Sequence, residues 1–175
     1  MKKRIPTRQI VLSAVFGILL LAALMFLCGA GGPISQRVVI FAILLLATGL
    51  LNLMGASTLP AANDAPEWQM IQGLLDVMMA IMLFMSSGTR LPTLLLILMA
   101  IWAVMGALAR AFSAAKLKGA LRRRAWFHTG GMLAGGALFL AGALIEALDP
   151  ALCIGFGLIF CALGSLWFKP SRRKS

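Results

Sequence analysis

Charged and chemically reactive side chains are scarce in this sequence. Its 175 residues include only five acidic side chains, one histidine and three cysteines, and charged residues of both signs make up 12% of the chain. Average soluble domains carry about 25% charged residues. With 61% hydrophobic residues as well, the composition excludes an ordinary soluble enzyme and a disordered tail, and it indicates a membrane protein.

The few reactive residues form no pattern that supports catalysis or metal binding. The histidine and the carboxylates are scattered along the chain, and the sequence contains no G-x-S-x-G, H-E-x-x-H or G-x-x-x-x-G-K motif. Cys28, Cys153 and Cys161 lie in or at the ends of apolar runs without a C-x-x-C spacing, so we interpret them as small packing residues. We therefore expect no enzymatic activity, no metal site and no cofactor.

Six apolar segments of 17 or more residues are long enough, or nearly so, to cross the hydrocarbon core of a membrane as helices. They are separated by glycine, proline and polar residues, and they cover residues 10–28, 38–54, 69–85, 91–109, 126–147 and 151–168. The first segment is longer than a signal-peptide core and lacks a clear cleavage site, so we expect it to be retained. The sequence predicts an all-α integral membrane protein, with one membrane domain of six transmembrane helices over residues 1–175.

Basic residues gather on one side of these spans. Four precede the first span, six lie between residues 110 and 124, and four follow the last span, whereas only Arg37 and Arg90 fall in connections on the other side. Cytoplasmic loops carry such an excess of lysine and arginine. We therefore expect a multi-pass protein of the bacterial inner membrane with both termini in the cytoplasm, and we attribute the net charge of +11 to orientation and not to nucleic-acid binding.

The segment 110–125 is expected to form a basic cytoplasmic loop. Apolar side chains alternate with its charges, so it has two interpretations: an orientation signal alone, or a stretch that lies along the membrane surface. In the second interpretation, anionic phospholipids contact Lys116, Lys118, Arg122, Arg123 and Arg124.

An internal repeat is visible in the spacing of tryptophan and glycine. Trp68 and Trp126 are 58 residues apart, and each is followed five residues later by a glycine, Gly73 or Gly131. The even-numbered spans carry glycines at similar intervals: Gly49, Gly106 and Gly164. This pattern predicts three helical hairpins, at approximately residues 10–54, 69–109 and 126–168. Because each hairpin starts and ends on the cytoplasmic side, the repeats are parallel, which is less typical of alternating-access transporters.

This pattern resembles the HdeD family of small bacterial inner-membrane proteins, which are built from a repeated hairpin. The resemblance is carried by Trp68-x4-Gly73, by Trp126-x4-Gly131, by the segment 101–106 and by Asp149-Pro150. It covers nearly the whole chain and is strongest over the last two hairpins. It implies a role in acid-stress resistance without defined catalytic or binding residues.

Asp76 is the first candidate for a functional residue. It lies eight residues into the third span, about 12 Å from the cytoplasmic end of that helix, where a carboxyl group by default marks a functional site. Gln72 stands one turn away on the same face. No basic residue lies at a matching depth in any span, so we expect no ion pair. Asp76 then has two interpretations: a neutral carboxyl group that donates to a hydroxyl such as that of Thr48 or to a backbone carbonyl, or a site that handles protons or cations.

A stripe of glycines runs along the fifth span. Gly131-x-x-x-Gly135 is a spacing that lets two helix backbones approach closely, and Gly142 continues the same face. We expect this face to pack against another span or against a second copy of the chain. His128 and Glu146 lie at the two ends of the stripe, and they are candidates for pH sensing or, alternatively, ordinary interfacial side chains.

Three functions stay open on these observations. The first is a non-enzymatic, HdeD-like membrane protein that supports acid or envelope stress resistance. The second is a small proton- or cation-coupled transporter or channel that uses Asp76. The third is a membrane subunit or assembly factor that acts through helix contacts. We expect its partners to be the lipid bilayer with its anionic phospholipids, and further copies of the chain or other membrane proteins.

Overall fold

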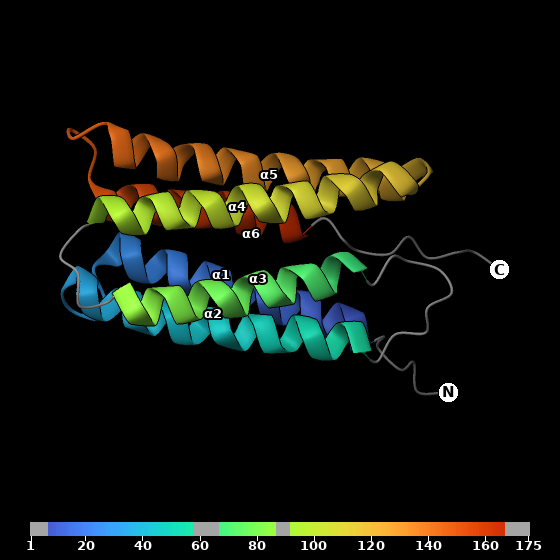
Figure 1. The fold of residues 1–175 in the computed structure, drawn as a ribbon, viewed down its shortest axis with the longest axis horizontal. Coiled ribbons are helices and arrows are strands. Elements are labelled where there is room, and N and C mark those ends of the chain that lie inside the picture. The colour runs from blue at the N-terminus through green and yellow to red at the C-terminus, as the bar shows by residue number, and fades with distance from the viewer. Residues whose placement is uncertain (1–6, 58–66, 87–91, 167–175) are drawn as a thin grey trace.

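The computed structural model describes residues 7–57, 67–86 and 92–166, and this part of the chain consists of six α-helices without a strand (Figure 1). The helices are α1 (Thr7–Cys28), α2 (Ile34–Ser57), α3 (Glu67–Ser86), α4 (Pro92–Lys116), α5 (Gly119–Leu144) and α6 (Pro150–Leu166). Arg90 and the basic residues expected at the two termini, other than Arg8, lie outside the described part, as do the side chains of Arg8, Trp68 and Arg124. The all-helical prediction is confirmed for the residues that are described.

Local sequence explains where several helices begin. Asp149 accepts a hydrogen bond from the backbone N–H of Ala151 at 2.7 Å, which caps α6, and Pro150 occupies the first helical position, where its missing N–H costs nothing. Pro92 begins α4 in the same way. α5 begins at Gly119, whose φ of +62° is in the left-handed region that favours glycine.

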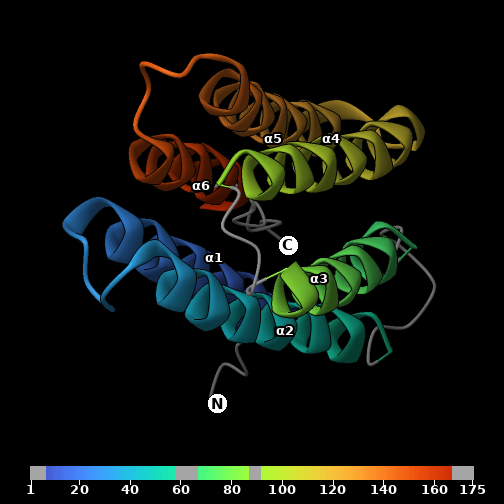
Figure 2. The same ribbon diagram turned by 60° about the vertical axis from the view of Figure 1, so that its left-hand side comes forward.

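Two layers of three helices make up the bundle. α1, α2 and α3 form one layer and α4, α5 and α6 form the other (Figures 1 and 2). The most extensive packing joins α4 to α5, α2 to α3, α5 to α6 and α1 to α6, while α1 with α2 and α3 with α4 share smaller contacts. The α1–α6 and α3–α4 contacts join the layers, so the six helices close a ring. Of the three expected hairpins, only the α5–α6 pair is among the extensive contacts.

The surface of the bundle is apolar and its interior contains polar groups. Large hydrophobic side chains such as Met54, Met78 and Leu144 are more than half exposed, whereas Asp76, Arg110 and His128 are buried. Within the described residues, four helical stretches are long and apolar enough to cross a membrane: Ile34–Ser57, Gln69–Ser86, Pro92–Lys116 and Ala125–Leu144. α1 and α6 add shorter apolar stretches, Ser13–Cys28 and Pro150–Leu163. These features are compatible with a multi-pass membrane protein, because lipid can cover an apolar exterior that water cannot.

The segment expected to be a basic loop, residues 110–125, is mostly helical. α4 continues to Lys116 and α5 begins at Gly119, so only Leu117 and Lys118 connect them. The reason is local: residues 107–116 are rich in alanine and contain no glycine or proline, so nothing ends the helix where the apolar run ends. This difference matters because it places Arg110 within α4.

α2 and α3 pack with their backbones in close approach. A Cβ atom built on Gly49 would lie 2.9 Å from the carbonyl oxygen of Gly73, and one built on Gly73 would lie 2.9 Å from the carbonyl oxygen of Gly49. Only glycine at both positions permits this distance. The contact places the inner face of α2, which carries Thr48 and Asn52, directly against Asp76 on α3.

Candidate functional site

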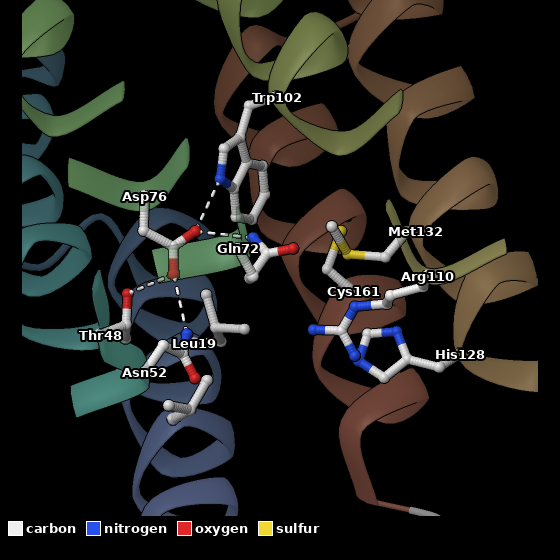
Figure 3. Close-up of a pocket in the computed structure, with 11 residues that line it drawn as sticks. Leu19, Thr48, Asn52, Gln72, Asp76, Trp102, Arg110, His128, Met132 and Cys161 are labelled. Carbon is white, nitrogen blue, oxygen red and sulfur yellow. Dashed lines mark hydrogen bonds between the residues drawn. The ribbon is translucent and has the colours of Figure 1, made fainter. Parts of the chain in front are cut away.

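Asp76 lies at the centre of a set of four hydrogen-bond donors. Its side chain is 2% exposed. Oδ1 accepts from Gln72 Nε2 at 2.7 Å and from Trp102 Nε1 at 2.9 Å. Oδ2 accepts from Asn52 Nδ2 at 3.1 Å and is 3.3 Å from Thr48 Oγ1 (Figure 3). Three helices, α2, α3 and α4, therefore hold one carboxyl group.

The hydroxyl of Thr48 can serve either protonation state of Asp76. It lies 2.8 Å from the carbonyl oxygen of Leu45 and 3.3 Å from Asp76 Oδ2, but it carries a single hydrogen. When it donates to Asp76, the ionised carboxylate has donors at both oxygens. When it donates to Leu45, its oxygen is left as an acceptor, and a neutral Asp76 can donate its O–H to it. A rotation of one hydroxyl therefore satisfies the carboxyl group with or without its proton.

A small buried cavity adjoins this carboxyl group. Its volume is about 20 Å³, which is enough for one water molecule. All six helices contribute to its wall, with Val15, Leu19, Thr48, Asn52, Gln72, Asp76, Trp102, Arg110, His128, Met132 and Cys161. The cavity thus lies where the two layers of the bundle meet.

Arg110 and His128 form the opposite wall of the cavity. Both are buried, at 8% and 1% exposure, and the guanidinium and the imidazole lie together across the cavity from Asp76 (Figure 3). This corrects the expectation that no basic residue shares the depth of Asp76. Arg110 follows Trp102 by eight residues on α4, and a long helical side chain runs back toward the N-terminal end of its helix. A buried carboxylate and a buried guanidinium compensate each other where either alone is costly.

Polar side chains in the interior are concentrated toward one end of the bundle. Among the described side chains, seven buried ones lie between the level of Asp76 and the end at which α2 and α4 finish and α3 and α5 begin (Figure 1): Asn52, Gln69, Gln72, Arg110, Ser113, His128 and Thr129. The other half of the described interior is filled by large apolar side chains, among them Phe41, Leu96 and Phe139. The polar interior therefore leads from Asp76 toward a single end.

The predicted glycine face of α5 packs against α6. A Cβ atom on Gly135 would lie 2.6 Å from the carbonyl oxygen of Gly157, and one on Gly142 would lie 2.7 Å from Cys153 Cβ. Gly131 is partly exposed. Gly135 and Gly142 thus lie where the helices approach closely within one chain.

His128 and Glu146, the two candidates for pH sensing, lie far apart. His128 lines the central cavity, whereas Glu146 is exposed beyond Leu144, the last residue of α5. They do not form one site, because most of the length of α5 separates them.

The candidate lipid-contact residues lie at the turn between α4 and α5. Lys116, Lys118, Arg122 and Arg123 are exposed there, and Phe112, at 72% exposure, is close by along α4. The described part of this group is therefore available to a surface outside the bundle.

Three residues of the site were missed from sequence. Asn52 follows Thr48 by four residues in an apolar span, and that polar pair on one helix face was a usable signal. Arg110 was assigned to a loop because it follows an apolar run. Trp102 gave no signal of its role, since its indole N–H is no different from that of any other tryptophan in sequence.

The chain matches no protein-family model, no curated protein and no solved structure. The chemistry of the site is therefore the basis for assigning a function. Both oxygens of Asp76 face N–H and O–H donors, and such hydrogen bonds stabilise a carboxylate in the interior.

Proposed function

We propose that the protein is a small proton-coupled transporter or channel of the bacterial inner membrane, in which Asp76 binds and releases the proton. One observation carries this proposal: the hydrogen-bond donors around Asp76 can satisfy it in both protonation states, and a guanidinium faces it across a cavity. A carboxyl group with only a structural role would need neither donors that suit both protonation states nor a guanidinium that faces it. Intramembrane carboxyl groups with polar neighbours are typical of proton relays.

The proton exchanges with the side of the membrane toward which the polar interior leads. In this proposal that side is the cytoplasm, since the exposed basic residues Lys116, Lys118, Arg122 and Arg123 lie at the same end. In this proposal both termini lie on the cytoplasmic side as well. The six helices correspond to three hairpin repeats that are parallel in orientation. The apolar half of the core then separates Asp76 from the other side.

Proton flux into liposomes tests the proposal. Purified protein is reconstituted, a pH gradient or a membrane potential is imposed, and internal pH is followed with an entrapped dye. The wild type is expected to show flux, and Asp76→Asn, which keeps the shape of the side chain, is expected to lose it. Glu146→Gln is the matched control, because it makes the same acid-to-amide change at an exposed position. Absence of flux from the wild type, or equal flux from Asp76→Asn, contradicts the proposal.

A role in acid or envelope stress resistance without transport is the second candidate. The resemblance to the HdeD family supports it, and so does the burial of three titratable side chains, Asp76, Arg110 and His128, around one cavity. Deletion of the gene followed by survival at low pH tests it. If survival falls and Asp76→Asn restores it fully, the stress role does not depend on proton binding at Asp76.

Anionic phospholipids are the proposed partner of the α4–α5 turn. Four exposed basic side chains and the exposed Phe112 support this, because basic residues near anionic lipid each contribute about 1 kcal/mol and aromatic side chains favour the interface. Binding of the protein in nanodiscs to added cardiolipin is expected to fall when Lys116, Lys118, Arg122 and Arg123 are replaced by glutamine.

A further inference from the structure

One of the two polar side-chain atoms of Gln72 makes a hydrogen bond within the described residues, and the other does not. Nε2 donates to Asp76 Oδ1 at 2.7 Å. Oε1 is buried and accepts no hydrogen bond from the described residues, and it points away from Asp76, toward the side of the cavity where Met132 and Arg110 lie (Figure 3). A buried acceptor of this kind is normally satisfied by protein or by ordered water. A flip of the amide group would not satisfy Oε1. It would place this oxygen against Asp76 Oδ1, and both atoms are acceptors.

The space that Oε1 faces is the cavity of about 20 Å³. This volume exceeds the roughly 10–15 Å³ that one water molecule needs. Its wall carries an acceptor in Gln72, a carboxyl group in Asp76 and guanidinium N–H groups in Arg110. A water molecule has two hydrogens to donate and lone pairs to accept with, so it matches a wall that presents both kinds of partner.

We propose that this cavity binds one ordered water molecule, which donates to Gln72 Oε1, accepts from the Arg110 guanidinium and links it to Asp76. Gln72 is then a positioning residue that holds the carboxyl group with one end and the water with the other. If Asp76 releases a proton as proposed above, its O–H turns from Thr48 to this water, which receives the proton: the carboxyl O–H bond breaks, and a carboxylate and a hydronium ion result. Uptake is the reverse step. The existence of the water site does not depend on transport, but its role in proton release rests on the proposed function.

Gly106 keeps the position beside Gln72 Oε1 open. A Cβ atom on Gly106 would lie 2.8 Å from Gln72 Oε1 and 2.6 Å from Met132 Cε. A methyl group there would crowd the amide oxygen and force a shift of the side-chain ends of Gln72 and Met132, which both line the cavity. Gly106→Ala is therefore a probe that perturbs the water side of Gln72 while all four donor residues of Asp76 are retained. Gly130→Ala is its matched control, since a Cβ atom on Gly130 of α5 meets nothing within 4 Å.

Hydroxyl-radical footprinting of the protein in nanodiscs tests the water site. X-rays generate radicals from water in place, so buried side chains are oxidised only where they contact bound water. Met132 and Trp102 line the cavity, and both are buried. Met99 has no exposed surface and does not line the cavity, which makes it an internal reference.

In the wild type and in Gly130→Ala, oxidation of Met132 and Trp102 is expected to exceed that of Met99. In Gly106→Ala, and in Gln72→Met as a second variant that removes the acceptor, it is expected to fall to the level of Met99. A wild type in which all three side chains are equally protected overturns the water site, and so does unchanged oxidation in both variants.

Proton flux measured on the same proteins separates this inference from the proposed function. If the wild type shows proton flux while Met132 and Trp102 are protected from oxidation, Asp76 handles protons without this water. Oxidation of Met132 without flux from the wild type means that the water is bound and the transport proposal fails. When the wild type shows both proton flux and oxidation of Met132, Gly106→Ala is expected to lose most of the flux, whereas Gly130→Ala is expected to keep it.

Discussion

Trp102 donates its indole N–H to Asp76 Oδ1 across 2.9 Å, and this bond joins the two layers of the bundle. Asp76 lies on α3 in one layer, and Trp102 lies on α4 in the other (Figure 1). Asn52 bonds the same carboxyl group to α2. Asp76 therefore connects three helices from both layers through one carboxyl group.

Trp102→Phe is expected to weaken the contact between the two helix layers. The substitution keeps most of the buried ring and removes the N–H, so Asp76 loses one of its donors. Loss of a hydrogen bond to a charged or buried polar group costs about 1–3 kcal/mol. Thermal unfolding in detergent measures the effect, with Trp126→Phe as the control, because Trp126 is 47% exposed. Equal unfolding temperatures for the two variants would contradict the role of this bond.

Thr48 is expected to report the proton on Asp76. In infrared difference spectra, the C=O stretch of a neutral carboxyl group moves to higher wavenumber when its O–H loses a hydrogen-bond acceptor. Thr48→Val removes the hydroxyl at nearly constant volume, and we expect this shift, whereas Thr48→Ser keeps the hydroxyl and should leave the band in place. Asp76→Asn identifies the band by its absence. A band unaffected by Thr48→Val would show that the proton lies elsewhere.

Arg110 and Asp76 are expected to be coupled energetically. Arg110→Gln removes the positive charge that faces the buried carboxyl group across the cavity, so stability is expected to fall when that group is ionised. In the double variant with Asp76→Asn neither charge is present, so the combined loss should be smaller than the sum of the single losses by about 0.5–3 kcal/mol. Chemical unfolding in mixed micelles measures all four proteins. Arg122→Gln, at an exposed position, should change stability little, and strict additivity would argue against the pair.

The proposed orientation is expected to appear in reporter fusions. A fusion at Ser87 should be active on the outer side of the membrane, and a fusion at Arg173 should be active in the cytoplasm, because Ser87 lies in a predicted outer connection and the chain end is predicted to be cytoplasmic. Alkaline phosphatase and green fluorescent protein give opposite readouts and therefore check each other. The reverse pattern would place the polar end of the interior on the outer side.

Parts of the site could be predicted from sequence because they are local. Gln72 and Asp76 are one helical turn apart, so any helix over this segment brings them together, and the bond of 2.7 Å between them follows. Thr48, 28 residues away, is one of the groups to which a neutral Asp76 was predicted to donate; its hydroxyl lies 3.3 Å from Asp76 Oδ2, where it can donate to the carboxyl group. Arg110 was misplaced because hydropathy marks the end of an apolar run and not the end of a helix.

The sequence by itself determined that the chain is helical, where most helices lie, that its composition is that of a membrane protein and that Asp76 is out of place in an apolar span. These properties depend on neighbouring residues, through helix propensity, capping and the cost of a carboxyl group in an apolar setting. Only the tertiary structure decided which side chains surround that group. Asn52 and Trp102 lie 24 and 26 residues from it in sequence, on helices whose packing is fixed by backbone approach at Gly49 and Gly73 and by the closed ring of six helices. Such contacts depend on how whole helices pack, and no local pattern records that.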